Sequence, residues 1–128
     1  MLLFLDDSPE RAAVMYQRMA PQVRERTIWC TTAEETIVVL RDYRKDLELV
    51  MLDHDLGGKQ FVNSKREDCG MEVVRYLEHF NHHNPIEFED FKTVGFIVHT
   101  HNIPAGQIMV ERLKKLGINK VSFKPFGE

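Results

Sequence analysis

The sequence predicts a single α/β domain, residues 1–128, in which a parallel β-sheet lies between layers of helices. Strand-like and helix-like patterns alternate along the whole chain, as they do in such folds. A length of 128 residues with 43% hydrophobic content also suits one domain with one core. Most of the strand-like runs end in reactive side chains, and parallel sheets carry their chemistry at the carboxyl ends of their strands.

The first strand is the short apolar run 2–5, which suits a strand buried on both faces. A helix begins directly after it, because Ser8 can cap the helix and Pro9 suits the first helical position. This helix is expected to continue to about Ala20, where Pro21 stops it.

The run 27–30 predicts the second strand. Thr32 and Glu35 follow with the spacing of a capping box, which predicts a helix to about Arg44. The apolar run 47–52 is rich in branched residues and predicts a central strand.

The C-terminal half continues the alternation, with a loop at 57–68, a helix at 71–80, a break at 81–85, a strand at 94–98, a helix opened by Pro104 and closed by Gly117, and a fifth strand at 121–123. The loop is longer than the usual connection, which favours a lid or specificity loop. A tolerated surface insertion explains its length equally well.

Alternation of this kind implies right-handed crossovers and a parallel sheet. In the flavodoxin-like strand order 2-1-3-4-5, the first, third, fourth and fifth strands are neighbours, and their reactive ends share one edge. The side chains expected there are Asp6, Asp7, Asp53, His54, Asp55, His99, Thr100, His101, Asn102 and Lys124.

The formal net charge is −3 and the basic residues are dispersed, so we expect no extended nucleic-acid surface. A phosphate-containing small molecule or an RNA end needs no such surface and remains a suitable partner. The apolar start is too short for a signal peptide and no run is long enough to span a membrane, so a cytoplasmic protein is expected. The sequence does not indicate the oligomeric state.

Four carboxylates brought to one edge would repel one another, and a divalent cation is the simplest neutraliser. The predicted metal ligands are Asp6, Asp7, Asp53 and Asp55, whose oxygen atoms suit Mg²⁺ or Mn²⁺. Lys124 and the Thr100 hydroxyl would face an anion held by the same ion. Taken alone, Asp7 is also explained as a solvated turn residue, and Lys124 is also explained as a surface lysine.

With these residues in this order, the chain resembles the response-regulator receiver domain over essentially its whole length. The resemblance implies that Asp6, Asp7 and Asp53 hold magnesium and that Asp53 is also the phosphoacceptor. It further implies that Thr100 and Lys124 contact the phosphoryl oxygens. The triplet Lys124-Pro125-Phe126 is a specific part of this likeness.

The sequence departs from the receiver pattern in two ways. It stops at Glu128, too early for the helix that normally follows the fifth strand, which weakens an ordinary output switch. It also places histidines around the acidic site: His54 beside Asp53, and His99 with His101, which share a face if the fourth strand extends that far. Such a pair offers general acid and base groups, or ligands for Mn, Fe or Zn, although either histidine alone is also explained by packing.

The pattern Asp-x-Asp-Leu-Gly at 53–57, with His-Thr-His-Asn at 99–102, is similar to the cyclic-phosphate processing receiver domains. This resemblance implies a metal-dependent enzyme that acts on phosphoesters, including cyclic phosphates of RNA ends or nucleotides. His99 or His101 would then donate a proton to the leaving ribose oxygen. The alternative is a phosphoacceptor module for signalling or binding, with Asp53 as its phosphorylation site.

Overall fold

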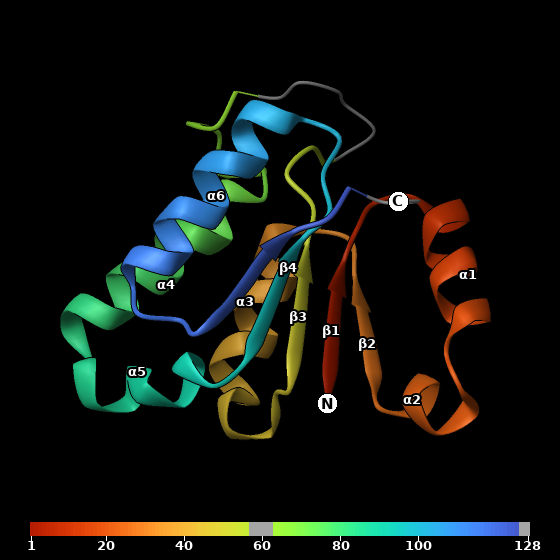
Figure 1. Cartoon of the computed structure of the whole chain (residues 1–128), viewed down its shortest axis with the longest axis horizontal. Helices are drawn as coiled ribbons and strands as arrows, with labels where there is room; N and C mark the ends of the chain where they lie inside the picture. Colours follow the sequence, from red (N-terminus) through yellow and green to blue (C-terminus); the bar gives the residue numbers. More distant parts are fainter. Residues whose placement is uncertain (57–62, 126–128) are drawn as a thin grey trace.

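The computed structural model describes residues 1–56 and 63–125. It contains a five-stranded parallel sheet in the order β2-β1-β3-β4-β5, which confirms the predicted strand order (Figure 1). The strands are β1 (Leu2–Leu5), β2 (Thr27–Cys30), β3 (Leu49–Leu52), β4 (Gly95–Val98) and β5 (Lys120–Phe123).

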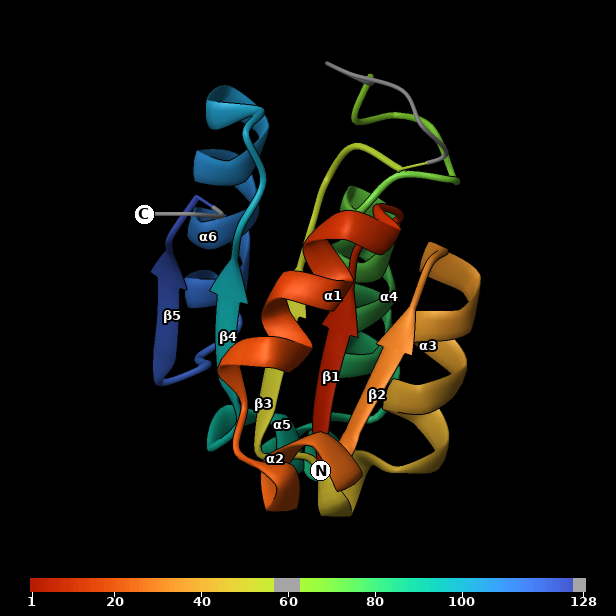
Figure 2. The ribbon, with the colours of Figure 1, turned by 90° about the vertical axis from the view of Figure 1, so that its right-hand side faces the viewer.

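Helices cover both faces of the sheet, and the two coverings are unequal (Figure 2). The helices are α1 (Pro9–Arg18), α2 (Pro21–Glu25), α3 (Ala33–Asp42), α4 (Met71–His83), α5 (Pro85–Lys92) and α6 (Ile103–Lys115). α1 lies over one face, whereas α3, α4 and α6 lie over the other. A 3₁₀ turn, η1 (Arg44–Asp46), precedes β3.

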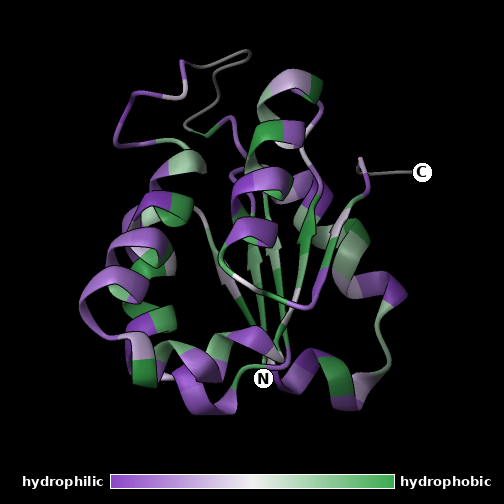
Figure 3. Ribbon diagram, turned by 60° about the vertical axis from the view of Figure 1, so that its left-hand side comes forward, coloured by the Kyte–Doolittle hydropathy of each residue, from purple (hydrophilic) through white to green (hydrophobic). Residues whose placement is uncertain are grey.

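The core follows this division. The larger cluster lies between the sheet and the helices α3 to α6, and Leu5, Leu52 and Val98 belong to it. A smaller cluster around Phe4 and Met51 lies under α1. Figure 3 shows the hydrophobic colouring concentrated on the strands and on the inner sides of the helices. Burial on both faces explains why the strands are short apolar runs without alternation.

The capping residues act as predicted: the Ser8 hydroxyl accepts a hydrogen bond from the Arg11 amide, and the Thr32 hydroxyl accepts one from the Glu35 amide. Gly117 ends the C-terminal helix with φ of 87°, in the left-handed region.

The short helices α2 and α5 were not predicted. The sequence patterns predict that Pro21 ends a helix and that 81–85 is a break, but Pro21 and Pro85 are each the first residue of a helix. Proline suits that position as well as it stops a preceding helix, so its presence alone does not distinguish the two. α1 accordingly ends at Arg18, and α4 continues to His83.

Half of the predicted loop at 57–68, residues 57–62, lies outside the described part of the chain, as does Phe126 of the KPF triplet. Residues 63–68 form turns that lead into α4. Among the described residues, no helix combines the length and the apolar character needed to cross a bilayer.

Candidate functional site

The strand register aligns four reactive residues in one row. Leu5 pairs with Leu52, Leu52 with Val98, and Val98 with Phe123, so the residues that follow them stand side by side. These residues are Asp6, Asp53, His99 and Lys124, and the amides of the last three donate to the carbonyls of Leu5, Leu52 and Val98. Since side chains alternate along a strand, this row belongs to the sheet face that α1 covers.

Asp6 is fully buried and accepts four hydrogen bonds. Its Oδ1 accepts from the Ser8 amide at 2.9 Å and from Arg11 Nη2 at 2.7 Å. Its Oδ2 accepts from Arg11 Nε at 2.8 Å and lies 3.2 Å from His99 Nε2. A buried carboxylate needs such partners, because its charge would otherwise be costly in a low dielectric.

Arg11 is a site residue that the sequence analysis missed. Its Nη2 also lies 3.4 Å from Asp53 Oδ2 and 3.6 Å from Asp7 Oδ1, so one guanidinium contacts three of the predicted metal ligands. The spacing of Asp6 and Arg11 in the sequence could have indicated this contact. A helix that starts directly after β1 turns the residue at i+5 from Asp6 back over the strand end.

The structure brings Asp6, Asp53 and His99 together. Each offers one ligand atom, these atoms lie within 4.8 Å of one another, and all three side chains are buried. The set fits a divalent cation that accepts two carboxylates and one imidazole, which suits Mn²⁺, Fe²⁺ or Zn²⁺ in addition to Mg²⁺. In the described part of the chain, Asp7 and Asp55 are not members of this group.

His99 is oriented by two contacts. Its ring stacks on Phe4 at a centroid distance of 5.1 Å, and its Nε2 faces Asp6. β4 ends at Val98, so the strand alternation expected to place His101 beside His99 does not extend that far. His101 is exposed, whereas His99 is buried.

The two carboxylates of the group have opposite pKa shifts. Burial by itself raises the pKa of Asp6, but hydrogen bonds from His99, Arg11 and the Ser8 amide outweigh it and lower the pKa to about 2. Burial is the largest cause at Asp53 as well, and there it keeps the pKa above the ordinary value, with the Asp6 charge adding to the rise. Two carboxyl groups with diverging pKa values are typical of sites that move protons or hold cations.

Asp55 belongs to a second network beside the first. Its Oδ1 lies 2.7 Å from His54 Nδ1 and accepts from Asn102 Nδ2 at 3.2 Å. His54 is fully buried, and its Nε2 lies 3.0 Å from the Ser64 hydroxyl. Burial alone would lower the pKa of His54, but hydrogen bonds with Cys69 and Asp55 raise it.

Asn102 connects this network to α6. Its Oδ1 accepts from the Ala105 amide and so caps the helix, and its own amide donates to the Thr100 hydroxyl at 3.1 Å. Thr100 faces α6, since its methyl carbon would lie 2.9 Å from a Cβ added at Gly106. Thr100 lies in the loop between β4 and α6.

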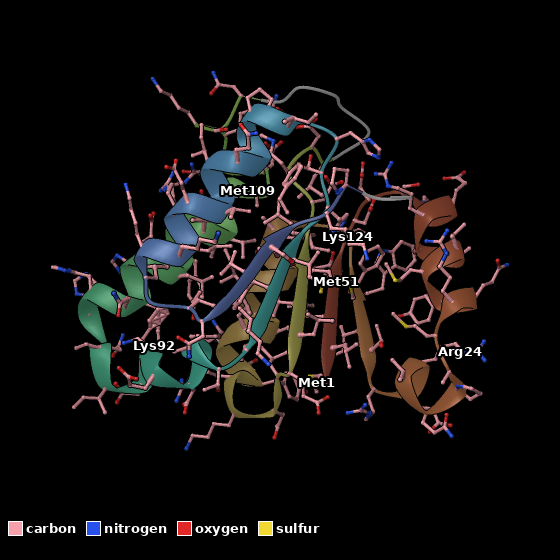
Figure 4. The ribbon with its side chains drawn as sticks, viewed as in Figure 1. Met1, Arg24, Met51, Lys92, Met109 and Lys124 are labelled. Atoms are coloured by element: carbon pink, nitrogen blue, oxygen red, sulfur yellow. The ribbon has the colours of Figure 1, made fainter. Side chains whose placement is uncertain are left out.

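Lys124 is exposed and directly follows β5. Figure 4 shows it at the sheet edge where β1 and β3 also end. It is the neighbour of His99 in the row of residues that follow the strands.

The row of strand ends lies at one edge of a 2-1-3-4-5 sheet. The family of cyclic-phosphate processing receiver domains matches residues 1–115. The chain belongs to this family. The family assignment agrees with the resemblance that the sequence indicated.

A solved structure of the signal receiver domain of a putative LuxO repressor protein from Vibrio parahaemolyticus is similar to this receiver domain, with a TM-score of 0.53 and 18% sequence identity. The similarity covers 97% of this chain and 77% of the other, and at this identity it shows a shared fold. No curated protein sequence matches the chain.

The buried charge of Asp6 predicts a pH dependence of stability. The pKa of Asp6 is about 2 in the folded protein and 3.8 as its reference value, so the ionised group stabilises the fold above pH 3.8 and this contribution is lost as the pH falls toward 2. In metal-free buffer, wild-type protein should lose about 2 kcal/mol more unfolding free energy over this range than Asp6→Asn. Urea denaturation at a series of pH values measures the difference.

Asp42→Asn provides the matched control, because Asp42 is exposed on α3 and pairs only with its neighbour Arg41 among the contacts described. Its pH profile should follow that of the wild type. Parallel profiles for all three proteins would contradict the stabilising role of Asp6.

Proposed function

We propose that this receiver domain is a metal-dependent enzyme that hydrolyses phosphoesters, with cyclic phosphates of nucleotides or RNA ends as its substrate class. The observation that carries the proposal is the buried group of Asp6, Asp53 and His99, whose ligand atoms lie within 4.8 Å of one another. Two carboxylates suffice for a receiver-type magnesium site, so the buried imidazole is the feature that favours catalysis. The family to which the chain belongs is described as cyclic-phosphate processing, which agrees with this proposal.

In the proposed site, Asp6, Asp53 and His99 hold the cation. A bound divalent ion would supply a water of lowered pKa and neutralise charge on the phosphoryl group. Asp6, with its pKa of about 2, remains an anionic ligand at any physiological pH. Burial and the Asp6 charge raise the pKa of Asp53 in the metal-free site, and a bound cation would offset both.

Hydrolysis of a cyclic phosphodiester places one water oxygen on phosphorus, breaks one bond from phosphorus to a ribose oxygen, and returns a proton to that oxygen. Lys124 is exposed in the row beside His99 and would stabilise the negative charge that builds on the phosphoryl oxygens. The Thr100 hydroxyl would add a hydrogen-bond donor. Exposed His101, two residues after His99, would protonate the leaving oxygen.

Purified protein should hydrolyse 2′,3′-cyclic or 3′,5′-cyclic nucleotides in the presence of Mn²⁺ or Mg²⁺. His99→Ala should lower turnover by about 100-fold or more through loss of a ligand, and His101→Ala by about 100-fold through loss of the proton donor. Chromatography of the nucleotide products measures both effects across a series of divalent ions.

His79→Ala is the control, since His79 is exposed on α4 and stacks only on the neighbouring His83 among the described ring contacts. It should keep wild-type turnover. The proposal fails if no divalent ion supports turnover, or if both His99→Ala and His101→Ala leave it unchanged.

A second function is supported by the alignment of Asp53 with Lys124 in the strand-end row and by the receiver fold itself. In this alternative, Asp53 accepts a phosphoryl group and Thr100 and Lys124 contact its oxygens. The domain would then act as a signalling or binding module.

Incubation with acetyl phosphate and Mg²⁺, followed by intact-mass measurement, tests the alternative. A phosphoacceptor should gain the mass of one phosphoryl group, and Asp53→Asn should abolish the gain. Asp42→Asn is the matched control, because Asp42 is exposed on α3 and should leave the gain intact. Absence of any gain that depends on Asp53 would exclude this function.

A further inference from the structure

The Arg11 guanidinium lies between Asp6 and Asp53, the two carboxylates proposed to hold a cation. Its Nη2 is 2.7 Å from Asp6 Oδ1 and 3.4 Å from Asp53 Oδ2, while its Nε is 2.8 Å from Asp6 Oδ2. The guanidinium thus forms a two-point contact with one proposed ligand and also reaches the second. Its positive charge already performs part of the neutralisation that a metal would perform.

The hydrogen-bond acceptor positions of the Asp6 carboxylate are all occupied. An ionised carboxylate offers about four lone-pair positions. The Ser8 amide, the two nitrogen atoms of Arg11 and His99 Nε2 use four of them. A metal ion can bind Asp6 only if one of these donors leaves.

Of the three donor residues, Arg11 is the one whose side chain can turn away into solvent. The Ser8 amide is fixed at the start of α1, where the Ser8 hydroxyl caps the helix. His99 is buried and stacks on Phe4. Binding an ion through Nε2 would end its contact with Asp6 Oδ2 but would leave the Arg11 guanidinium between the two carboxylates. The Arg11 side chain is 34% exposed and unbranched up to its guanidinium, so it can turn toward solvent.

We infer that Arg11 is a built-in competitor for the metal site, so that a divalent cation enters between Asp6 and Asp53 only in exchange for the Arg11 guanidinium. This inference rests on the metal site of the proposed function. It adds that the ion pair between Arg11 and Asp6 occupies the site in the metal-free protein. The affinity for a metal ion then depends on how much more favourably that ion binds the two carboxylates than the Arg11 guanidinium does. An ion that also binds His99, such as Mn²⁺ or Zn²⁺, has the advantage over Mg²⁺ in this exchange.

Replacement of Arg11 should therefore tighten metal binding. Hydrogen bonds to a charged group correspond to about a 10- to 100-fold change in affinity, and Arg11→Gln should lower the dissociation constant for Mn²⁺ by this factor. Isothermal titration calorimetry without substrate measures it. Arg24→Gln removes the same charge from α2, which Figure 4 places away from the strand-end row, and should bind Mn²⁺ as the wild type does.

Equal affinity of wild type and Arg11→Gln, weaker binding by Arg11→Gln, or no binding by either would overturn the inference. Circular dichroism checks that Arg11→Gln is folded, and Arg11→Lys, which keeps the charge but not the two-point contact, should show an intermediate affinity.

The wild-type protein offers a second measurement that needs no variant. In the metal-free state the Arg11 Nε proton is hydrogen-bonded to Asp6 and should give a protected resonance in a ¹⁵N correlation spectrum. Titration with diamagnetic Zn²⁺ should move this resonance to the position of solvent-exposed arginines. A resonance that stays in place while Zn²⁺ binds would overturn the exchange.

These outcomes separate the inference from the proposed function. Exchange without turnover would leave the inference intact and contradict the enzyme. Turnover with an unmoved Arg11 resonance would support the enzyme and contradict the exchange.

Discussion

The structure of the site depends on the burial of the Asp6 carboxylate at the end of β1. Its two oxygens bind the start of α1 through Ser8 and Arg11, and they face β4 through His99. Its backbone connects to β2, because its amide donates to the Cys30 carbonyl and its carbonyl accepts from Trp29 Nε1 at 2.7 Å. One charged residue therefore fixes the positions of a helix and two strands, and the other site residues are arranged around its charge.

The remaining geometry follows from close packing at the same edge. A Cβ added at Gly70 would lie 1.8 Å from the Asp53 carbonyl oxygen, so the start of α4 can approach β3 this closely only with glycine. Gly106 has the corresponding role at α6, where an added Cβ would lie 2.1 Å from Phe123. The Asp53 side chain at this edge is itself buried, and burial is the main reason that its pKa is raised.

Sequence patterns predicted the fold well because burial on both faces leaves a direct trace: apolar runs for strands, capping residues at helix starts, and a strand order that collects the reactive ends. The same patterns did not predict which side chains at the strand ends would contact one another. The patterns group Asp55 with Asp6, yet Asp55 pairs with His54 and Asn102. Its side-chain direction is set by the backbone after the end of β3, where strand alternation no longer applies. Arg11 was missed because an arginine in a first helical turn resembles any surface residue until the helix is placed against Asp6.

The central claim is that Asp6, Asp53 and His99 form one cation site in a receiver fold. The most direct test is a crystal structure of the protein grown with Mn²⁺ and measured at the manganese absorption edge. The claim predicts one anomalous peak within about 2.5 Å of an oxygen of Asp6, an oxygen of Asp53 and a ring nitrogen of His99. A peak held by the carboxylates with His99 still facing Asp6 would contradict the imidazole ligand, and no peak at this edge would contradict the metal site itself.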